Sequence, residues 1–273
     1  KKALALESSN FNAWLNYGIS QKKLKNFNSA IDCFKKCISL NSTDSKPLSN
    51  LGEILIELND FNGAKNCFEQ SLLINPNSAD DMTNLGIAYK NMNDYKKSIK
   101  YHLEAIKINN NHSAAYSNLG ITYRRVFKNK KALTYLNKAI EINADLESAW
   151  INKGLILADM NKYEESKFCY EKVIKLNKNN AEVYLNLSLL ELANQKYING
   201  WKYYEKRWQT KNFQKYITTK KKQWDGITKH KSILIVSEQG LGDQILYASM
   251  FNELKKFSKK IHLLCDPKLF SLF

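Results

Sequence analysis

A glycine-containing turn near the end of the chain holds the residues best suited to catalysis. The run Gly240-Leu241-Gly242-Asp243 follows an apolar, β-branched stretch at 232–237. Two glycines let the backbone bend sharply, and a helix starting there presents unpaired N–H groups that bind anions such as phosphate. Asp243 would lie at the carboxyl end of a strand as a general base, or would instead cap the following helix. The pattern indicates an anion-binding turn beside a carboxylate.

A dinucleotide-binding turn is the competing interpretation of the same glycines. Its fingerprint requires a third glycine, but Ile245 occupies that position. Asp266 is the acid that would bind a ribose in this interpretation. Because the third glycine is missing, the dinucleotide-binding interpretation is weaker than that of an anion-binding turn beside a carboxylate.

A second set of candidate binding residues is a row of asparagines that recurs every 34 residues. Its members are Asn16, Asn50, Asn84, Asn118, Asn152 and Asn186. Equivalent helices in a stack lie about 10 Å apart, and an extended peptide advances about 3.3 Å per residue. Each amide offers both donors and an acceptor, so the row matches the backbone of a bound polypeptide. The alternative is that each asparagine satisfies its own local backbone.

Two adjacent arginines add a basic point to the same region of the chain. Arg124 and Arg125 fall near the end of the fourth segment that carries such an asparagine. A guanidinium recognises carboxylates with good geometry, so the pair is a candidate for binding an acidic residue. Solvated surface charge is the alternative.

The 34-residue period predicts the elements that must position these side chains. In each unit the asparagine is followed two residues later by a small residue, which is glycine in the first five copies. Large apolar residues precede it, and a further small residue follows twelve positions after the glycine. This spacing predicts two antiparallel helices per unit, joined by short turns such as Asn59-Asp60 and Asn93-Asp94. Units of this kind stack and bury a continuous core.

The repeat resembles the tetratricopeptide (TPR) repeat. The similarity is greatest at residues 84–89, Asn-Leu-Gly-Ile-Ala-Tyr, and at 74–76, Ile-Asn-Pro. The family implies a mainly α fold, here a right-handed superhelix of about six helix pairs over residues 11–214, with 1–10 ending a preceding repeat. It also implies a concave groove that binds a peptide or protein.

The C-terminal region follows a different pattern. After a basic linker at 215–231, an apolar strand is expected at 232–237, an amphipathic helix at about 244–257 and a second buried strand at 260–265. This β-α-β order is the opening of a parallel, Rossmann-like α/β domain over 232–273. Too few strands are present to complete a sheet.

Residues 197–273 resemble TPR-fused glycosyltransferases of the GT-B fold, which include heptosyltransferase-like and O-GlcNAc transferase-like proteins. The similarity rests on residues 238–245, on Trp224-Asp225-Gly226 and on the aromatic segment 200–208. It implies a nucleotide-sugar donor and makes Asp243 the catalytic base, with Gly240, Leu241 and Gly242 as the anion turn. In the O-GlcNAc transferase-like relatives the corresponding asparagine row holds the acceptor polypeptide. The donor contacts of these relatives lie mostly in a second α/β domain, to which no residue here can be matched.

Composition narrows the classes of partner. The formal net charge is +16, and eleven Lys or Arg residues against two acids lie between 196 and 231. This charge suits an acidic or phosphorylated partner or a solvated lysine surface; nucleic acid is disfavoured because no recognition module accompanies it. Five cysteines, an odd number, favour a reducing, cytoplasmic compartment over a disulfide framework. No metal-binding set and no 18-residue apolar span is present.

Two functions therefore remain open. In the first, the chain is part of an inverting glycosyltransferase, with repeats that deliver a polypeptide acceptor. In the second, it is a non-enzymatic adaptor that binds proteins and ends in a degenerate α/β cap. The chain begins at Lys1 in the middle of a repeat pattern, so we expect a piece of a longer protein, binding no cofactor and inactive by itself.

Overall fold

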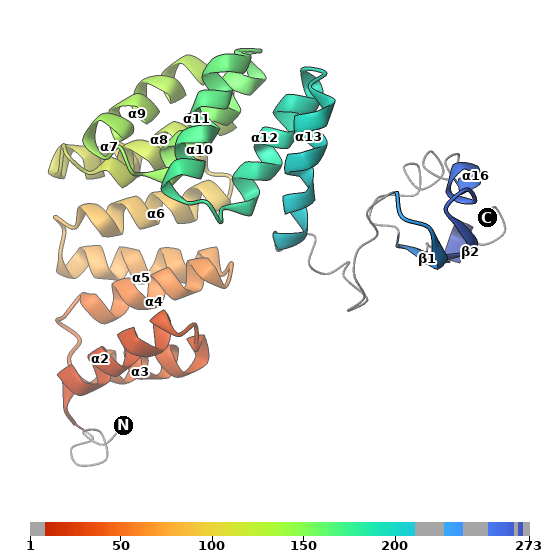
Figure 1. The fold of residues 1–273 in the computed structure, drawn as a ribbon. Helices are drawn as coiled ribbons and strands as arrows, with labels where there is room; N and C mark the ends of the chain where they lie inside the picture. Colours follow the sequence, from red (N-terminus) through yellow and green to blue (C-terminus); the bar gives the residue numbers. More distant parts are fainter. Residues whose placement is uncertain (1–8, 211–226, 237–250, 265–266, 270–273) are drawn as a thin grey trace. The chain divides into compact units, whose positions relative to one another are not determined.

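The computed structural model describes residues 9–210, 227–236, 251–264 and 267–269 (Figure 1). The chain divides into two units, Lys1–Lys178 and Asn179–Phe273. Each unit is described by itself below.

The described part of the first unit consists of five antiparallel helix pairs stacked in chain order (Figure 1). In the first four pairs the second helix also contacts the first helix of the next pair, as α3 contacts α4 and α5 contacts α6. The helices are α2 (Phe11–Lys23), α3 (Phe27–Leu40), α4 (Lys46–Glu57), α5 (Phe61–Ile74), α6 (Ala79–Asn91), α7 (Tyr95–Ile108), α8 (Ser113–Arg125), α9 (Asn129–Ile142), α10 (Glu147–Asp159) and α11 (Tyr163–Leu176). These pairs confirm the predicted helical repeats.

Close contact between the two helices of each pair explains the repeated glycine. A Cβ placed on Gly52 would lie 2.6 Å from the ring of Phe68, a distance that no real side chain tolerates. Phe68 is fully buried, and so is Ala64, the small residue predicted at the crossing of the two helices. The glycine therefore leaves the space that one large side chain of the second helix fills.

The turns inside the pairs have the chemistry expected from the sequence. Asn59 and Asn93 both adopt the left-handed conformation, with φ of 62°, which asparagine tolerates better than most residues. The next residue then caps the second helix: Asp60 accepts from the N–H of Gly63 at 2.9 Å, and Asp94 accepts from that of Lys97 at 3.1 Å. These contacts confirm the predicted turns.

The junction between the second and third pairs contains a buried polar cluster that the sequence did not indicate. One carboxylate oxygen of Asp81 accepts from Ser71 at 2.6 Å and from Ser49 at 2.9 Å. Asp81 is only 3% exposed and Ser71 is fully buried. The bonds join α4, α5 and α6, so this cluster ties neighbouring pairs together.

The second unit begins with α12 (Ala181–Ala193) and α13 (Tyr197–Tyr204), followed by the 3₁₀ helix η1 (Glu205–Gln209). These helices form the sixth pair, but its second member is much shorter than the others. The α-helix ends at Tyr204, within the aromatic segment 200–208. Arg207 occupies the position that Ala105 and Ala139 hold in earlier pairs. Its guanidinium lies 4.3 Å from the ring centres of both Tyr204 and Trp208. This stacking accompanies the change of helix type.

Two strands follow, β1 (His230–Val236) and β2 (Ser258–Leu264). They pair in parallel, with His230 opposite Ser258 and Ile233 opposite Ile261. Parallel neighbours require a crossover connection, as the predicted β-α-β order has it. The described part of the intervening helix, α16 (Phe251–Leu254), ends three residues before the predicted end at Phe257; the remaining short helix is η2 (Pro267–Leu269). The two strands give weak support to a Rossmann-like unit.

His102 occupies the place that Phe34, Phe68 and Tyr170 fill in other pairs. It is fully buried against Gly86, and neither ring nitrogen has a hydrogen-bond partner. Burial lowers the pKa of His102 from its ordinary 6.5 to about 3, with smaller contributions from electrostatic repulsion by Lys90 and His112. The ring is therefore neutral in the folded protein, and its two nitrogens are buried without hydrogen bonds that would offset their loss of solvation.

We expect His102→Phe to raise the free energy of unfolding at neutral pH by roughly 1–3 kcal/mol, because two uncompensated polar atoms are removed. Below pH 6.5 the unfolded chain protonates this histidine whereas the folded chain does not. Wild-type stability should therefore fall with decreasing pH down to about 3, and this residue contributes up to about 1.4 kcal/mol per pH unit. Urea unfolding of both proteins at pH 8, 6.5 and 5 measures the difference, and a gap that does not widen in acid contradicts the assignment.

Phe127 lies at the turn position that asparagine holds in three other pairs. It has a φ of 58° and its side chain is 90% exposed. A bulky residue in the left-handed region carries backbone strain, and this ring recovers little through burial.

Phe127→Asn should therefore stabilise the protein by about 1 kcal/mol, the strain that an L-residue stores in this conformation. The reciprocal change Asn93→Phe, at the equivalent turn, is the matched control and should destabilise by a similar amount. Thermal unfolding of the two variants provides the comparison. Equal melting temperatures for wild type and both variants would show that the turn stores no strain.

Candidate polypeptide-binding face

The six asparagines of the predicted row all lie on the first helices of their pairs. They are half-buried, except Asn16, which is exposed. Each belongs to an equivalent helix at an equivalent position, so the five asparagines of the first unit form a row there, while Asn186 belongs to the second unit. The binding role of the row remains a prediction.

Three of these asparagines bond to their own helix. The amide groups of Asn50, Asn118 and Asn152 donate to the carbonyl four residues earlier, at 2.9, 2.9 and 2.8 Å. In each of the three, one side-chain N–H therefore bonds to the local backbone, as the alternative interpretation expected. Asn50 is used further, because its oxygen accepts from Lys22 at 2.7 Å. In Asn118 and Asn152 the oxygen and the second N–H are left for another partner.

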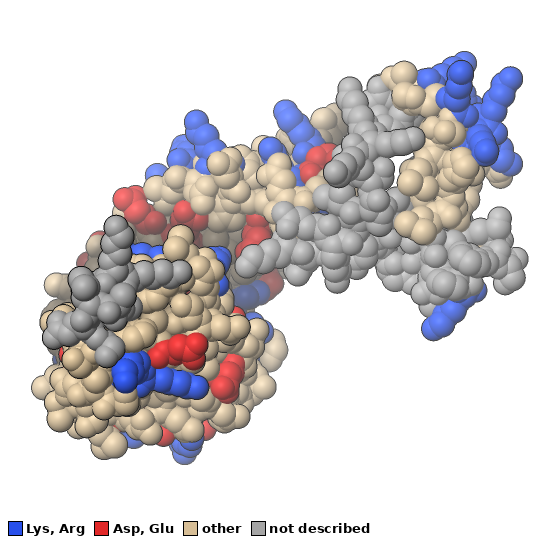
Figure 2. Space-filling view, turned by 90° about the horizontal axis from the view of Figure 1, so that it is seen from below, with Lys and Arg blue, Asp and Glu red and all other residues tan. Residues whose placement is uncertain are grey.

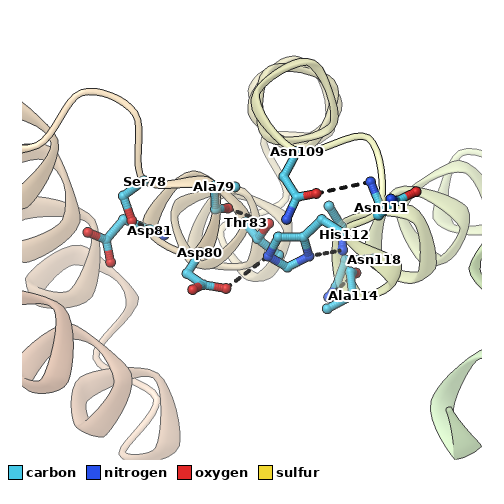
Figure 3. Close-up of polar contacts among 11 residues, drawn as sticks. Ser78, Ala79, Asp80, Asp81, Thr83, Asn109, Asn111, His112, Ala114 and Asn118 are labelled. Atoms are coloured by element: carbon cyan, nitrogen blue, oxygen red, sulfur yellow. Dashed lines mark hydrogen bonds and ion pairs between the residues drawn. The ribbon is translucent and has the colours of Figure 1, made fainter. Parts of the chain in front are cut away.

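A histidine bridges the third and fourth pairs close to Asn118 (Figure 3). His112 precedes α8, where its Nδ1 accepts from the N–H of Ala115 at 3.2 Å, while its Nε2 lies 2.8 Å from Asp80 at the start of α6. Because Nδ1 accepts, the proton is on Nε2 and is donated to the carboxylate. Asp80 is 86% exposed, so it leaves an accessible negative charge at this end of the two helices.

The opposite ends of α6 and α8 are basic. Arg124 binds Asp159 of α10 at 3.3 Å, and Arg125 is exposed. Lys90, at the end of α6, is half-buried. Its pKa is lowered mainly by this burial and to a smaller extent by the charge of Arg125. Sequence reasoning missed Lys90, although it precedes Arg124 by one period and could have been found by comparing successive repeats.

The predicted catalytic turn lies outside the described residues. Gly240, Leu241, Gly242 and Asp243 all fall within 237–250. Their roles as anion turn and base remain predictions from the sequence.

The described cysteines behave as packing residues. Cys33, Cys37 and Cys169 are buried and Cys67 is half-buried, all as free thiols. Burial raises the pKa of Cys37, Cys67 and Cys169 to about 11, which makes them poor nucleophiles at neutral pH.

Charges of both signs occur on the molecular face drawn in Figure 2, where blue and red groups are interspersed among uncharged residues. Among the described residues, no three His, Cys, Asp or Glu side chains gather in a way that would hold a metal ion. Over the same parts of the chain, no helix has both the length and the apolar character needed to span a membrane.

Several solved structures share the fold. The protein of the Pseudomonas aeruginosa pilF study has 16% identity and a TM-score of 0.62, over 75% of this chain and 95% of that one. A chain of the APC/C Cut9–Hcn1 hetero-tetramer has 12% identity and a TM-score of 0.71, over 76% of this chain and 41% of its own length. YrrB, described as a TPR protein with an unusual peptide-binding site, has 18% identity and a TM-score of 0.50, over 71% of this chain and 96% of that one. At these identities the likeness shows the fold alone.

A search of curated protein sequences finds no match to this chain.

Family models place the repeats in the sequence. Tetratricopeptide repeat models match residues 11–44, 45–78, 78–145 and 148–180. Their boundaries follow the helix pairs of the first unit, from the start of α2 to the end of α11. The chain therefore belongs to the tetratricopeptide repeat proteins.

Proposed function

We propose that this protein binds an extended polypeptide segment along the first helices of its repeats. The observation that carries the proposal is the asparagine row, in which Asn118 and Asn152 each keep an oxygen and an N–H beyond their local bond. Asn84 occupies the equivalent place one repeat before Asn118 and forms no side-chain hydrogen bond with a described residue. The three amides fit a ligand that presents alternating donors and acceptors, as a peptide backbone does. YrrB, whose description names a peptide-binding site, shares the fold.

Binding without catalysis, as in an adaptor, is sufficient to account for the repeats. A large shared surface built from small, equivalent contacts suits recognition of main chain more than of one side chain. Such a surface accepts many sequences, and specificity then requires additional charged or apolar contacts at particular repeats.

A second candidate function is transfer of a sugar to the bound polypeptide. The parallel pairing of β1 and β2 favours it, because this pairing is the start expected of a Rossmann-like α/β domain. The likeness of residues 238–245 to GT-B glycosyltransferases supplies the catalytic assignment, with Asp243 as the base for the acceptor hydroxyl.

Replacing Asn84, Asn118 and Asn152 together by Ala should weaken polypeptide binding. The probes are peptides selected on the wild-type protein from a display library of unstructured 15-residue segments. Each lost amide–backbone bond is worth about 1 kcal/mol, so the dissociation constant should rise on the order of 100-fold. Fluorescence anisotropy measures it.

The matched control replaces Asn75, Asn109 and Asn143, which follow the second helices of three pairs, by Ala. These residues have the same chemistry, lie in neighbouring parts of the chain and are absent from the row. Binding should persist in this control, and both proteins should retain their helical circular dichroism. Unchanged affinity in the first variant would mean that the row is purely structural.

For the second candidate, Asp243→Asn should lower sugar transfer by about 10²- to 10⁴-fold, the usual contribution of a general base. The assay uses the protein at its natural length, a panel of nucleotide-sugar donors and the selected peptides. The melting temperature should not change, since the amide has the same shape as the carboxylate. Turnover retained by the variant would exclude Asp243 as the base, and a wild-type protein that transfers no sugar would favour the adaptor.

A further inference from the structure

Successive junctions of the repeat stack can be compared position by position, because the period is constant. Arg124 ends α8 and pairs with Asp159 at the end of α10, with 3.3 Å between nitrogen and oxygen. One period earlier, the corresponding residues are Lys90, at the end of α6, and Arg125, at the end of α8. The same geometry that joins a cation to a carboxylate in one junction therefore brings two cations together in the other.

Direct contact between the two helices supports this juxtaposition. α6 and α8 pack against each other, as α8 and α10 do. The burial of Lys90, and after it the charge of Arg125, lower the pKa of this lysine. Two like charges on packed helix ends repel each other, and half-burial of Lys90 weakens screening by water.

The other junctions of the first unit avoid this conflict. At the first junction the corresponding residues are Lys22 and Glu57, which have opposite charges, and Lys22 binds Glu53 and Asn50. At the second, the corresponding residues are Ile56 and Asn91, which carry no charge. Lys90 and Arg125, in contrast, form no ion pair with any described residue.

We propose that Lys90 and Arg125 form an anion site that binds a carboxylate side chain of the polypeptide lying along the first helices. The inference rests on the proposed function and adds a ligand chemistry to it. A carboxylate placed between the two cations would take the part that Asp159 plays one repeat later. It would also offset the repulsion between the two cations, so that binding of the carboxylate stabilises the junction between α6 and α8.

Several observations favour a peptide carboxylate. Arg125 is exposed and Lys90 is half-buried, so a ligand can reach both from the surface. Asn84 and Asn118 are on the same two helices, six residues before Lys90 and seven before Arg125, or about 10 Å along a helix at about 1.5 Å per residue. An extended segment that contacts the asparagines can therefore direct an acidic residue to the helix ends.

The test uses Arg125→Asp, which converts this junction into the arrangement of Arg124 and Asp159. The probe is a fluorescein-labelled decamer of glutamate, compared with a glutamine decamer at constant ionic strength. Affinity for the glutamate decamer should fall at least tenfold, because the new carboxylate occupies Lys90 and repels the ligand. Binding of the uncharged decamer should change less than twofold.

The matched control is Lys107→Asp. Lys107 is an exposed residue in the last turn of α7, so the variant changes net charge by the same amount and places the same acid at a helix C-terminus. It should bind the glutamate decamer within twofold of wild type. Arg125→Asp should also unfold at a higher temperature than Lys107→Asp, since only the carboxylate introduced at position 125 gains a half-buried cation as its partner. That advantage should disappear when Lys90→Met is added.

The outcomes separate this inference from the proposed function. Equal affinity of Arg125→Asp and Lys107→Asp for the glutamate decamer would overturn the anion site; the proposed function would then still be judged by the asparagine variants and the selected peptides. Oligothymidylate, a polyanion without carboxylates, provides a further check. If wild type binds it as tightly as the glutamate decamer, and Arg125→Asp loses tenfold in affinity for both, the carboxylate site is also overturned. That result would mark a general polyanion surface instead of a carboxylate site.

Discussion

Close packing of two helices at a glycine is the constraint on which the five helix pairs of the first unit depend. A large side chain from the second helix fills the space above the glycine, as Phe68 does above Gly52. The small residue Ala64 lets the same helices approach near their crossing. This contact fixes how each pair is formed, and the regular stack follows because each pair leaves an apolar face for the next.

The packing divides each first helix into faces with different tasks. One face meets its partner helix and another meets the neighbouring repeat, where Ser49, Ser71 and Asp81 form a buried cluster. The face that carries the asparagines is engaged only in part by local bonds, as at Asn118 and Asn152. Function can vary on this face without disturbing the core, since side chains there are not needed to hold the helices together.

Within the first unit, three departures from the repeat pattern lie in the third and fourth pairs. His102 replaces a buried apolar side chain, Phe127 replaces a turn asparagine, and Lys90 faces Arg125 where a cation and a carboxylate could pair. Each departure costs stability by a different mechanism: an unsatisfied polar group, a strained backbone and like-charge repulsion. A repeat protein tolerates such costs because neighbouring repeats contribute stability through their shared interfaces.

The repeat itself was predictable from the sequence because its causes are local and periodic. Gly52, Asn59 and Asp60 have fixed packing, turn and capping roles, so a constant spacing was enough to indicate helix pairs and their order. The membership of the asparagine row followed from the same spacing. The shortening of α13 was not predictable, because the ring stacking of Arg207 depends on how the last turn closes in space.

Only the tertiary structure decided which polar groups are already used. The side-chain oxygen of Asn50 accepts a hydrogen bond from Lys22 of the preceding repeat, and Asp80 is joined to His112 across 32 residues. Such contacts depend on side-chain geometry between helices, which the linear spacing does not contain. The sequence by itself thus determined the repeating pairs and the positions that could bind a ligand, whereas packing between pairs decided which of those positions keep unused donors, acceptors and charge.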